Sequence, residues 1–174
     1  LHGSNWAAGE IAHMNLDLSR ASENWKARGY LESIVGSDRI LSQLSSTAAS
    51  PAAAQPSARQ FLEHARTQTG RPREFFDEIM QHLGIAVANL ICAFDPGLVI
   101  LQGGIFRAGD DRVREVIASA VPWDTRVVVS DIANDAVLLG AVAAARAQAY
   151  ERIARLLDES NTATVASEPA FARA

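Results

Sequence analysis

The stretch Leu98-Val99-Ile100-Leu101-Gln102-Gly103-Gly104 decides which class of fold the sequence favours. Four apolar residues follow the turn-forming Asp95-Pro96-Gly97 and predict a short buried strand. A glycine pair directly after a buried strand lets a ligand approach the backbone closely, because neither residue carries a Cβ. A plain tight turn explains the same pair equally well. The run therefore predicts a strand and leaves open what the end of that strand does.

Helices and a second strand are predicted on both sides of this strand. Apolar residues at helical spacing predict a helix over 73–94, with Pro72 in its first turn and Gly84 permitting close packing. Three further elements are a helix over 111–121, a β-branched strand over 125–130 and a helix over 135–157. Strands that alternate with helices in this way indicate an α/β fold with a small sheet.

Shorter elements are predicted in the first half of the chain. Residues 1–14 suit a loop that leads into a short extended segment, 29–44 suit one or two helices with Ser37 as a cap, and 58–68 suit an amphipathic helix. Trp6 is expected to pack against the protein, with stacking on a bound ligand as the alternative.

Two segments lack the residues that would order them. Residues 45–57 have no aromatic and no large aliphatic side chain, which predicts a mobile loop inside one domain or, alternatively, a domain linker. Residues 158–174 have no periodicity and predict a disordered tail. We therefore expect one domain over 1–157.

Composition excludes several classes of protein. The 174 residues are 48% hydrophobic, which is enough for one real core and argues against overall disorder. The net charge is −4 without any basic run or helix-turn-helix pattern, so no nucleic-acid surface is expected on this chain. No signal peptide and no apolar stretch of about 18 residues is present, so we expect a soluble cytoplasmic protein.

The remaining cysteine and histidines suggest no chemistry of their own. Cys92 falls in an apolar helical pattern and is predicted to be a buried thiol, and a single cysteine allows no disulfide within the chain. His64 and His82 lie off the main apolar stripes and are predicted to be exposed.

Glu10, His13 and Glu32 are the candidate binding residues. The two carboxylates can accept hydrogen bonds from adjacent hydroxyls of a polyol, and such charge-assisted bonds are roughly twice as strong as neutral ones. The imidazole can add a donor or an acceptor, depending on its tautomer. Ordinary structural roles explain the same residues: two surface carboxylates and a satisfied core histidine.

A resemblance favours the binding role. The motifs Gly9-Glu10-Ile11-x-His13-Met14 and Gly29-x-Leu31-Glu32 resemble the sugar site of the ROK family, which comprises bacterial repressors and sugar kinases. Short motifs at 88–90, 94–96, 99–105 and 138–141 resemble the C-terminal half of that family in the same order, and the resemblance covers residues 3–157. It implies that Glu10, His13 and Glu32 contact sugar hydroxyls.

The resemblance breaks at a metal site. In members that bind zinc, a histidine matching His13 joins three cysteines, and the matching positions here are Glu23, Trp25 and Tyr30. Structural zinc requires four ligands, mostly Cys or His, so we predict no zinc. We expect Trp25 and Tyr30 to replace the metal cross-link with a small aromatic cluster.

The resemblance also implies a fold and a nucleotide. It implies the second lobe of an actin-like ATPase (ribonuclease H-like) fold, incomplete without an N-terminal lobe. Gly103 and Gly104 would then face the adenosine end of ATP, although Gln102 replaces the first of three usual glycines. No Asp-x-Gly-x-Thr phosphate loop occurs in the sequence, so ATP binding is expected only together with the missing lobe.

Three functions remain open. The first is the sugar-sensing portion of a ROK-type transcriptional regulator, which would contact DNA only through a missing N-terminal domain. The second is the C-terminal lobe of an ATP-dependent sugar kinase. The third is an inert remnant that folds and associates with further copies of itself. Because the chain begins with Leu1 and reaches the candidate site almost at once, we expect it to be the C-terminal part of a longer protein or a truncated reading frame.

Overall fold

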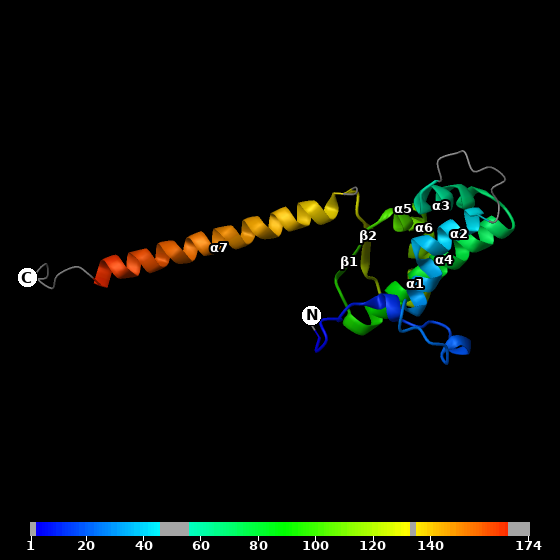
Figure 1. Ribbon diagram of the computed structural model, residues 1–174, viewed down its shortest axis with the longest axis horizontal. Helices are drawn as coiled ribbons and strands as arrows, with labels where there is room; N and C mark the ends of the chain where they lie inside the picture. Colours follow the sequence, from blue (N-terminus) through cyan, green and yellow to red (C-terminus); the bar gives the residue numbers. More distant parts are fainter. Residues whose placement is uncertain (1–2, 46–55, 133–134, 167–174) are drawn as a thin grey trace, which may run out of the picture. The chain divides into compact units, whose positions relative to one another are not determined.

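The sheet consists of two parallel strands joined by helices. The structure is a computed structural model that describes residues 3–45, 56–132 and 135–166. Strand β1 (Leu98–Leu101) pairs in parallel with β2 (Arg126–Val129), with Leu98 opposite Arg126 and Leu101 opposite Val129 (Figure 1). Helices α5 (Gly104–Ala108) and α6 (Asp110–Ala120) connect the strands. Parallel strands need such a crossover, and both predicted strands are confirmed.

Helix α4 (Arg71–Phe94) is the centre of the core. Its inward side chains are almost completely buried: Phe76, Ile79, Met80 and Ile91. Gly84 lies against α6, where an added Cβ would come within 2.5 Å of the Val116 Cβ. The predicted close packing at Gly84 is therefore confirmed, and α6 is the element that requires it.

The first part of the chain packs as short helices around α4. Two 3-10 turns, η1 (Ile11–His13) and η2 (Leu18–Arg20), precede α1 (Tyr30–Val35), α2 (Ser37–Ser45) and α3 (Ala58–Thr67). The extended segment expected before residue 14 is wrong, because Met14 bonds back to Ile11 and closes a turn. Helix α3 begins with a capping box between Ser57 and Gln60. The expected mobile loop lies mostly at 46–55, outside the described residues.

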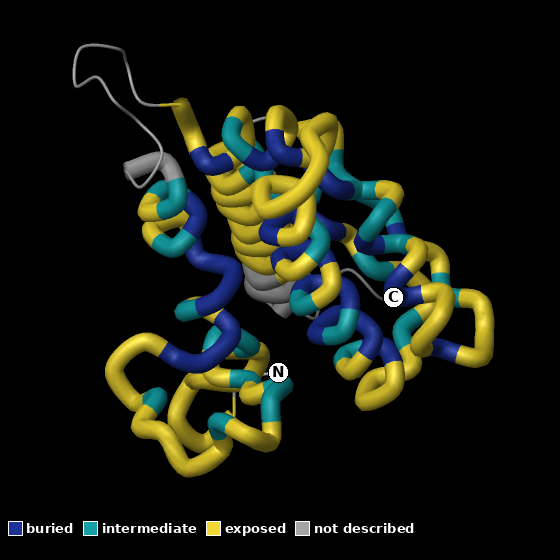
Figure 2. Tube along the Cα trace, turned by 90° about the vertical axis from the view of Figure 1, so that its right-hand side faces the viewer, coloured by how far each residue is buried: buried dark blue, intermediate teal, exposed yellow. Residues whose placement is uncertain are grey.

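The prediction of a fully buried strand over 98–101 is half wrong. Leu101 on β1 and Val127 on β2 face the core, whereas Leu98 and Ile100 are 46% and 61% exposed. Side chains of a strand alternate between faces, so helices that cover one face of the sheet bury only alternate residues. Figure 2 shows buried, intermediate and exposed residues interspersed along the Cα trace.

Two other burial predictions are wrong. Cys92 is exposed, because only the α4 stripe that continues to Ile91 faces the core. Trp6 does not pack into the core and is 80% exposed. His64 is exposed, as predicted.

Residues Asp131–Ala174 form a unit separate from Leu1–Ser130. Its helix α7 (Ala136–Ala166) continues past residue 157, so the tail predicted from 158 is helical to 166, and 167–174 lie outside the described residues. The apolar side chains of α7 between 137 and 157 are exposed. Among the helices of the described ranges, none combines the length and apolarity that crossing a bilayer requires.

Candidate functional site

Gly29 brings the two candidate motifs into contact. Its φ is +85°, and a Cβ at this position would lie 2.3 Å from the Ala12 carbonyl oxygen and 3.0 Å from the His13 nitrogen. Turn η1 therefore packs directly on the residue that precedes α1. Only glycine combines this backbone conformation with so close an approach. Segments 9–14 and 29–32, which are distant in sequence, are neighbours at this point.

The three candidate side chains are accessible. Glu10, His13 and Glu32 are all exposed, so the expected alternative of a core histidine at 13 is excluded. Glu10 precedes η1 without capping it, which leaves its carboxylate available to another donor. That the three groups bind one ligand stays a prediction.

Glu32 has a charged neighbour that the motif did not indicate. Its Oε1 and an Arg28 Nη2 lie 2.6 and 3.1 Å from the point where a Gly36 Cβ would sit. Both groups therefore lie beside Gly36, and Arg28 also forms an ion pair with Asp38 at 3.4 Å. A ligand that reaches the Glu32 carboxylate would meet a guanidinium next to it.

The positions that match zinc-binding cysteines form an aromatic and ionic cluster. The rings of Trp25 and Tyr30 meet edge to face at a centroid distance of 5.3 Å, as predicted. The Arg20 guanidinium lies 4.5 Å from the Trp25 ring centre and forms two hydrogen bonds of 2.8 and 2.9 Å with Glu23. Trp25 Nε1 donates to the Arg20 carbonyl. These contacts join the two ends of the segment 20–30 through an aromatic pair and an ion pair.

Charges in this loop shift the pKa values of its acids. The Ser19 hydroxyl and backbone N–H lower the pKa of Asp17, and the hydrogen bond from Arg20 lowers the pKa of Glu23. Burial, with a smaller contribution from Asp17, raises the pKa of Tyr30. Across 3–45, 56–132 and 135–166, no three His, Cys, Asp or Glu side chains gather as a metal site.

His82 belongs to the same cluster, contrary to the prediction that it is a surface residue. It is half-buried, and its Nε2 lies 3.2 Å from the Tyr30 hydroxyl. The sequence did indicate that His82 could be partly buried, because it lies three residues after Ile79 and seven after Phe75, on the flank of the buried stripe. The sequence around His82 did not indicate that its partner is Tyr30, which lies 52 residues away in the chain.

The glycine pair after β1 has two different environments. Gly103 has a φ of +127° and open space where a Cβ would be, which is compatible with close approach of a ligand. Gly104 instead lies under the side chain of Arg59 from α3, whose Cβ would be 3.2 Å from an added methyl group. Packing explains Gly104, and nucleotide contact at either glycine stays a prediction.

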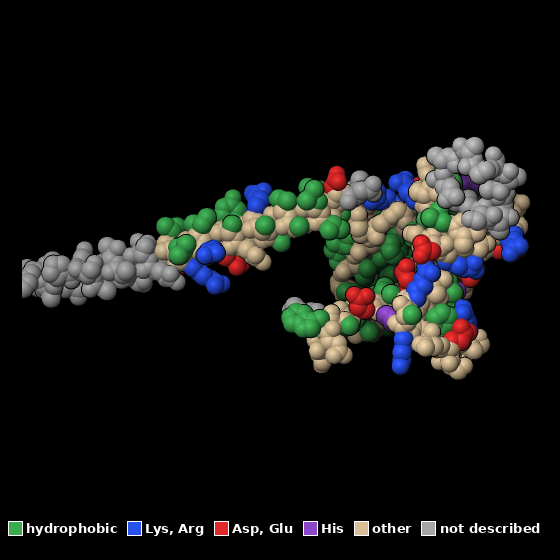
Figure 3. Space-filling view, viewed as in Figure 1, with side chains coloured by type: hydrophobic (Ala, Val, Ile, Leu, Met, Phe, Trp, Pro, Cys, Tyr) green, Lys and Arg blue, Asp and Glu red, His purple; other side chains and the backbone are tan. Residues whose placement is uncertain are grey.

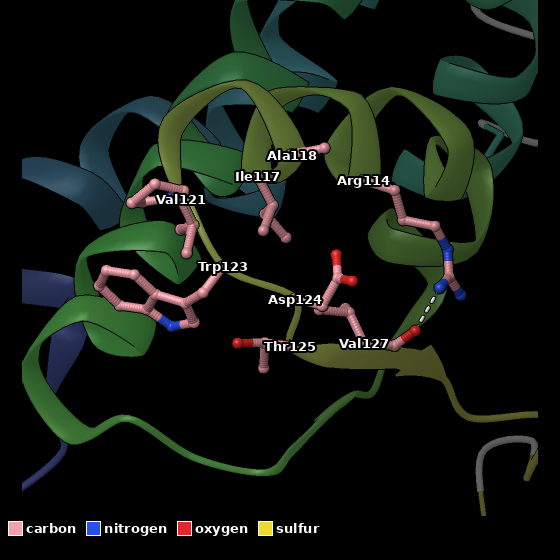
Figure 4. A pocket seen from close by; sticks show the side chains of 9 residues that line it. Arg114, Ile117, Ala118, Val121, Trp123, Asp124, Thr125 and Val127 are labelled. Carbon is pink, nitrogen blue, oxygen red and sulfur yellow. Dashed lines mark hydrogen bonds between the residues drawn. The ribbon is translucent and has the colours of Figure 1, made fainter.

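A pocket of about 450 Å³ lies elsewhere, between α6 and the start of β2 (Figure 4). Arg114 at its edge is held by Asp110 and by the Val127 carbonyl, to which it donates. The other lining residues are Ile117, Ala118, Val121, Pro122, Trp123, Asp124, Thr125 and Val127. None of the predicted site residues lines it, so this pocket is not the predicted sugar site.

Comparison with known proteins identifies the family. A sequence model described as the ROK family matches residues 1–148. The chain belongs to the ROK family. It is 28% identical over 160 residues to a glucokinase from Thermotoga maritima, and the match covers 81% of this chain and 50% of that enzyme. This ROK chain thus spans about half the length of the curated relative that it matches.

Solved structures support the fold. A ROK hexokinase from Thermus thermophilus matches with a TM-score of 0.58 and 21% identity, over 81% of this chain and 48% of the hexokinase. A ROK family transcriptional regulator, a homologue of the E. coli MLC protein, matches with a TM-score of 0.57 and 20% identity, over 74% and 36% of the two chains. The same fold therefore occurs in an enzyme and in a regulator. At about 20% identity, these two matches show the fold of this chain and do not show its function.

Proposed function

We propose that the chain carries one wall of a carbohydrate site made by Glu10, His13 and Glu32. The contact of Gly29 with Ala12 and His13 is the observation that carries this proposal, because it joins the two motifs into one surface. Membership of the ROK family supports it. Glu10 and Glu32 would accept hydrogen bonds from sugar hydroxyls, and His13 would donate or accept according to its tautomer.

The other wall would come from a lobe that this chain does not contain. The proposed architecture is the second lobe of an actin-like fold, with the sugar bound in the cleft between lobes. The accessibility of Glu10, His13 and Glu32 supports this arrangement, since groups that face an interlobe cleft are exposed in one lobe alone. The chain matches only half of its curated relative, which agrees with a shared site.

We favour a sugar sensor of a transcriptional regulator over a kinase. Two departures support this choice: an aromatic cluster occupies the positions of zinc-binding cysteines, and Gln102 replaces a glycine at the expected nucleotide turn. Sugar would act by binding one arrangement of the two lobes more tightly than another, and so shift the population that a DNA-binding part encounters.

The second candidate is the C-terminal lobe of a ROK sugar kinase. The 28% identity to a glucokinase favours it. In that case Gly103, with open space above its backbone, would lie at the adenosine end of ATP. The coding sequence upstream of Leu1 decides between the two candidates, because a winged helix-turn-helix there indicates a regulator and a phosphate loop indicates a kinase.

Calorimetry with D-glucose tests the sugar site. Glu10→Gln and Glu32→Gln should each weaken binding about 5- to 150-fold, since each removes a charged acceptor from a polar site at about 1–3 kcal/mol. Glu151→Gln is the matched control, because this glutamate is exposed on α7. Unchanged affinity in both site variants would remove these residues from the proposal.

A further inference from the structure

A polar contact ties the start of α1 to the middle of α4. The Tyr30 hydroxyl lies 3.2 Å from His82 Nε2, and His82 Nδ1 lies 2.9 Å from the Glu78 carbonyl oxygen. A carbonyl can only accept, so Nδ1 carries a proton, and in the tautomer protonated there alone Nε2 is an acceptor. In that tautomer the Tyr30 hydroxyl is the donor.

Tyr30 is built into the core and cannot turn away from this partner. It is 2% exposed, and Trp25 and His82 lie against its ring. Arg20 extends over both aromatic rings, 4.5 Å from the Trp25 centre and 5.7 Å from the Tyr30 centre. A hydroxyl in such surroundings needs a hydrogen-bond partner, and His82 provides it.

The charges that face this contact favour a protonated phenol. Asp17 and Glu23 from the loop, and Glu78 from α4, all raise the pKa of Tyr30, whereas Arg20 lowers it. Burial has the largest effect and also raises this pKa. The Tyr30 hydroxyl therefore stays protonated and can donate a hydrogen bond to His82.

We propose that Tyr30 and His82 are positioning residues that hold Gly29 and Glu32 against the His13 segment without a metal ion. This proposal rests on the proposed sugar site. Helix α1 has only six residues, and a helix of that length is not stable by itself. Its orientation therefore depends on side chains that anchor it to α4. Tyr30 lies directly after Gly29 and two residues before Glu32.

The contact between Tyr30 and His82, called the anchor below, is also linked to the loop before α1. The Gly29 N–H donates to the Trp25 carbonyl at 2.7 Å, and Ser33 bonds to both the Gly29 and Tyr30 carbonyls. Loss of the Tyr30 contact should therefore loosen residues 15–29 together, and with them the close contact between Gly29 and Ala12. In this proposal the aromatic cluster cross-links the loop before α1, a role that a bound metal ion could otherwise have.

Hydrogen exchange and glucose calorimetry on the whole chain test this positioning role. Tyr30→Phe removes only the hydroxyl and should speed amide exchange in 15–29 about three- to tenfold, and His82→Gln should do the same. The affinity for D-glucose should fall by a similar factor. Tyr150→Phe and His64→Gln are matched controls, because both residues are exposed on other helices.

Two further variants separate positioning from general stability. Ile117→Val on α6 weakens the core away from the cluster and should change neither exchange in 15–29 nor glucose affinity. The double variant Tyr30→Phe with His82→Gln should cost less than the sum of the two single effects, because each already breaks the same bond.

Amide exchange and glucose affinity test separate parts of the proposal. Unchanged exchange in Tyr30→Phe overturns the anchor, whether or not sugar binds. Faster exchange with wild-type glucose affinity overturns positioning and leaves Glu10 and Glu32 in the site. If the wild-type chain binds no glucose, the sugar site is wrong for this probe, and the exchange result still decides the anchor.

Discussion

At the scale of single residues, the glycine at position 29 has the most specific role. Its φ is +85°, and a Cβ added to it would lie 2.3 Å from the Ala12 carbonyl oxygen. Gly9 also has a positive φ, of +94°, but has open space where a Cβ would be. Comparison of substitutions at Gly29 and Gly9 therefore separates the cost of backbone strain from the cost of steric contact.

Gly29→Ala should destabilise the protein by about 1–3 kcal/mol more than Gly9→Ala, because both variants strain φ and only the first forces atoms together. Urea unfolding of both variants measures the difference in the free energy of unfolding. Equal losses would mean that η1 does not press on α1 as closely as the structure indicates.

At the scale of elements, the loop over 15–28 is held by charged groups as well as by the contact of Trp25 with the core residue Tyr30. Asp17 accepts hydrogen bonds from the Ser19 N–H and hydroxyl at 2.9 and 2.7 Å, and Glu23 pairs with Arg20. Figure 3 shows acidic and basic side chains side by side on the visible face of residues 3–130, without a patch of one sign. Contacts of this kind depend on pH.

Acid should open this loop before it unfolds the core. The folded-state pKa values of Asp17 and Glu23 lie below their ordinary values of 3.8 and 4.5, so their stabilising effect is complete above those values and is lost as pH falls further. Amide exchange in 15–28 should therefore rise below about pH 4, relative to α4. In Glu23→Gln the rise should be smaller, and a pH-independent loop in the wild type would contradict the prediction.

Helix packing gives a second prediction at this scale. Alanine normally stabilises a helix interior by about 1 kcal/mol relative to glycine. At Gly84 this gain should be reversed, because the new methyl group would lie 2.5 Å from the Val116 Cβ and overpacking costs about 1–3 kcal/mol. Gly140→Ala on α7 is the control with free space. Thermal unfolding should show a lower midpoint for Gly84→Ala only.

At the scale of the whole molecule, the chain has half the length of its curated relative and should lack part of the chemistry. Phosphoryl transfer needs phosphate-binding loops, a metal ligand and a base, and the phosphate loop pattern is absent from the sequence. The purified chain should therefore transfer no phosphate from ATP to glucose. A coupled assay that detects turnover would refute this expectation and favour the kinase.

The sequence by itself determined the local structure and the family. Helical and strand periodicity located α3, α4, α6, both strands and the start of α7, because these patterns depend on neighbouring residues. The Gly-Glu-Ile-x-His and Gly-x-Leu-Glu motifs indicated the ROK family, which the family match confirms. The pairing of Trp25 with Tyr30 was also predictable, since both occupy positions that a metal would otherwise join.

Only the tertiary structure decided which distant residues meet and which apolar residues stay exposed. His82 faces Tyr30 across 52 residues, Gly29 lies on Ala12, and Gly104 lies under Arg59. Leu98, Ile100 and Cys92 are exposed although their local patterns are apolar. The physical reason is common to all of them: burial and contact depend on which helices pack on which face, and periodicity along one segment carries no information about its partner.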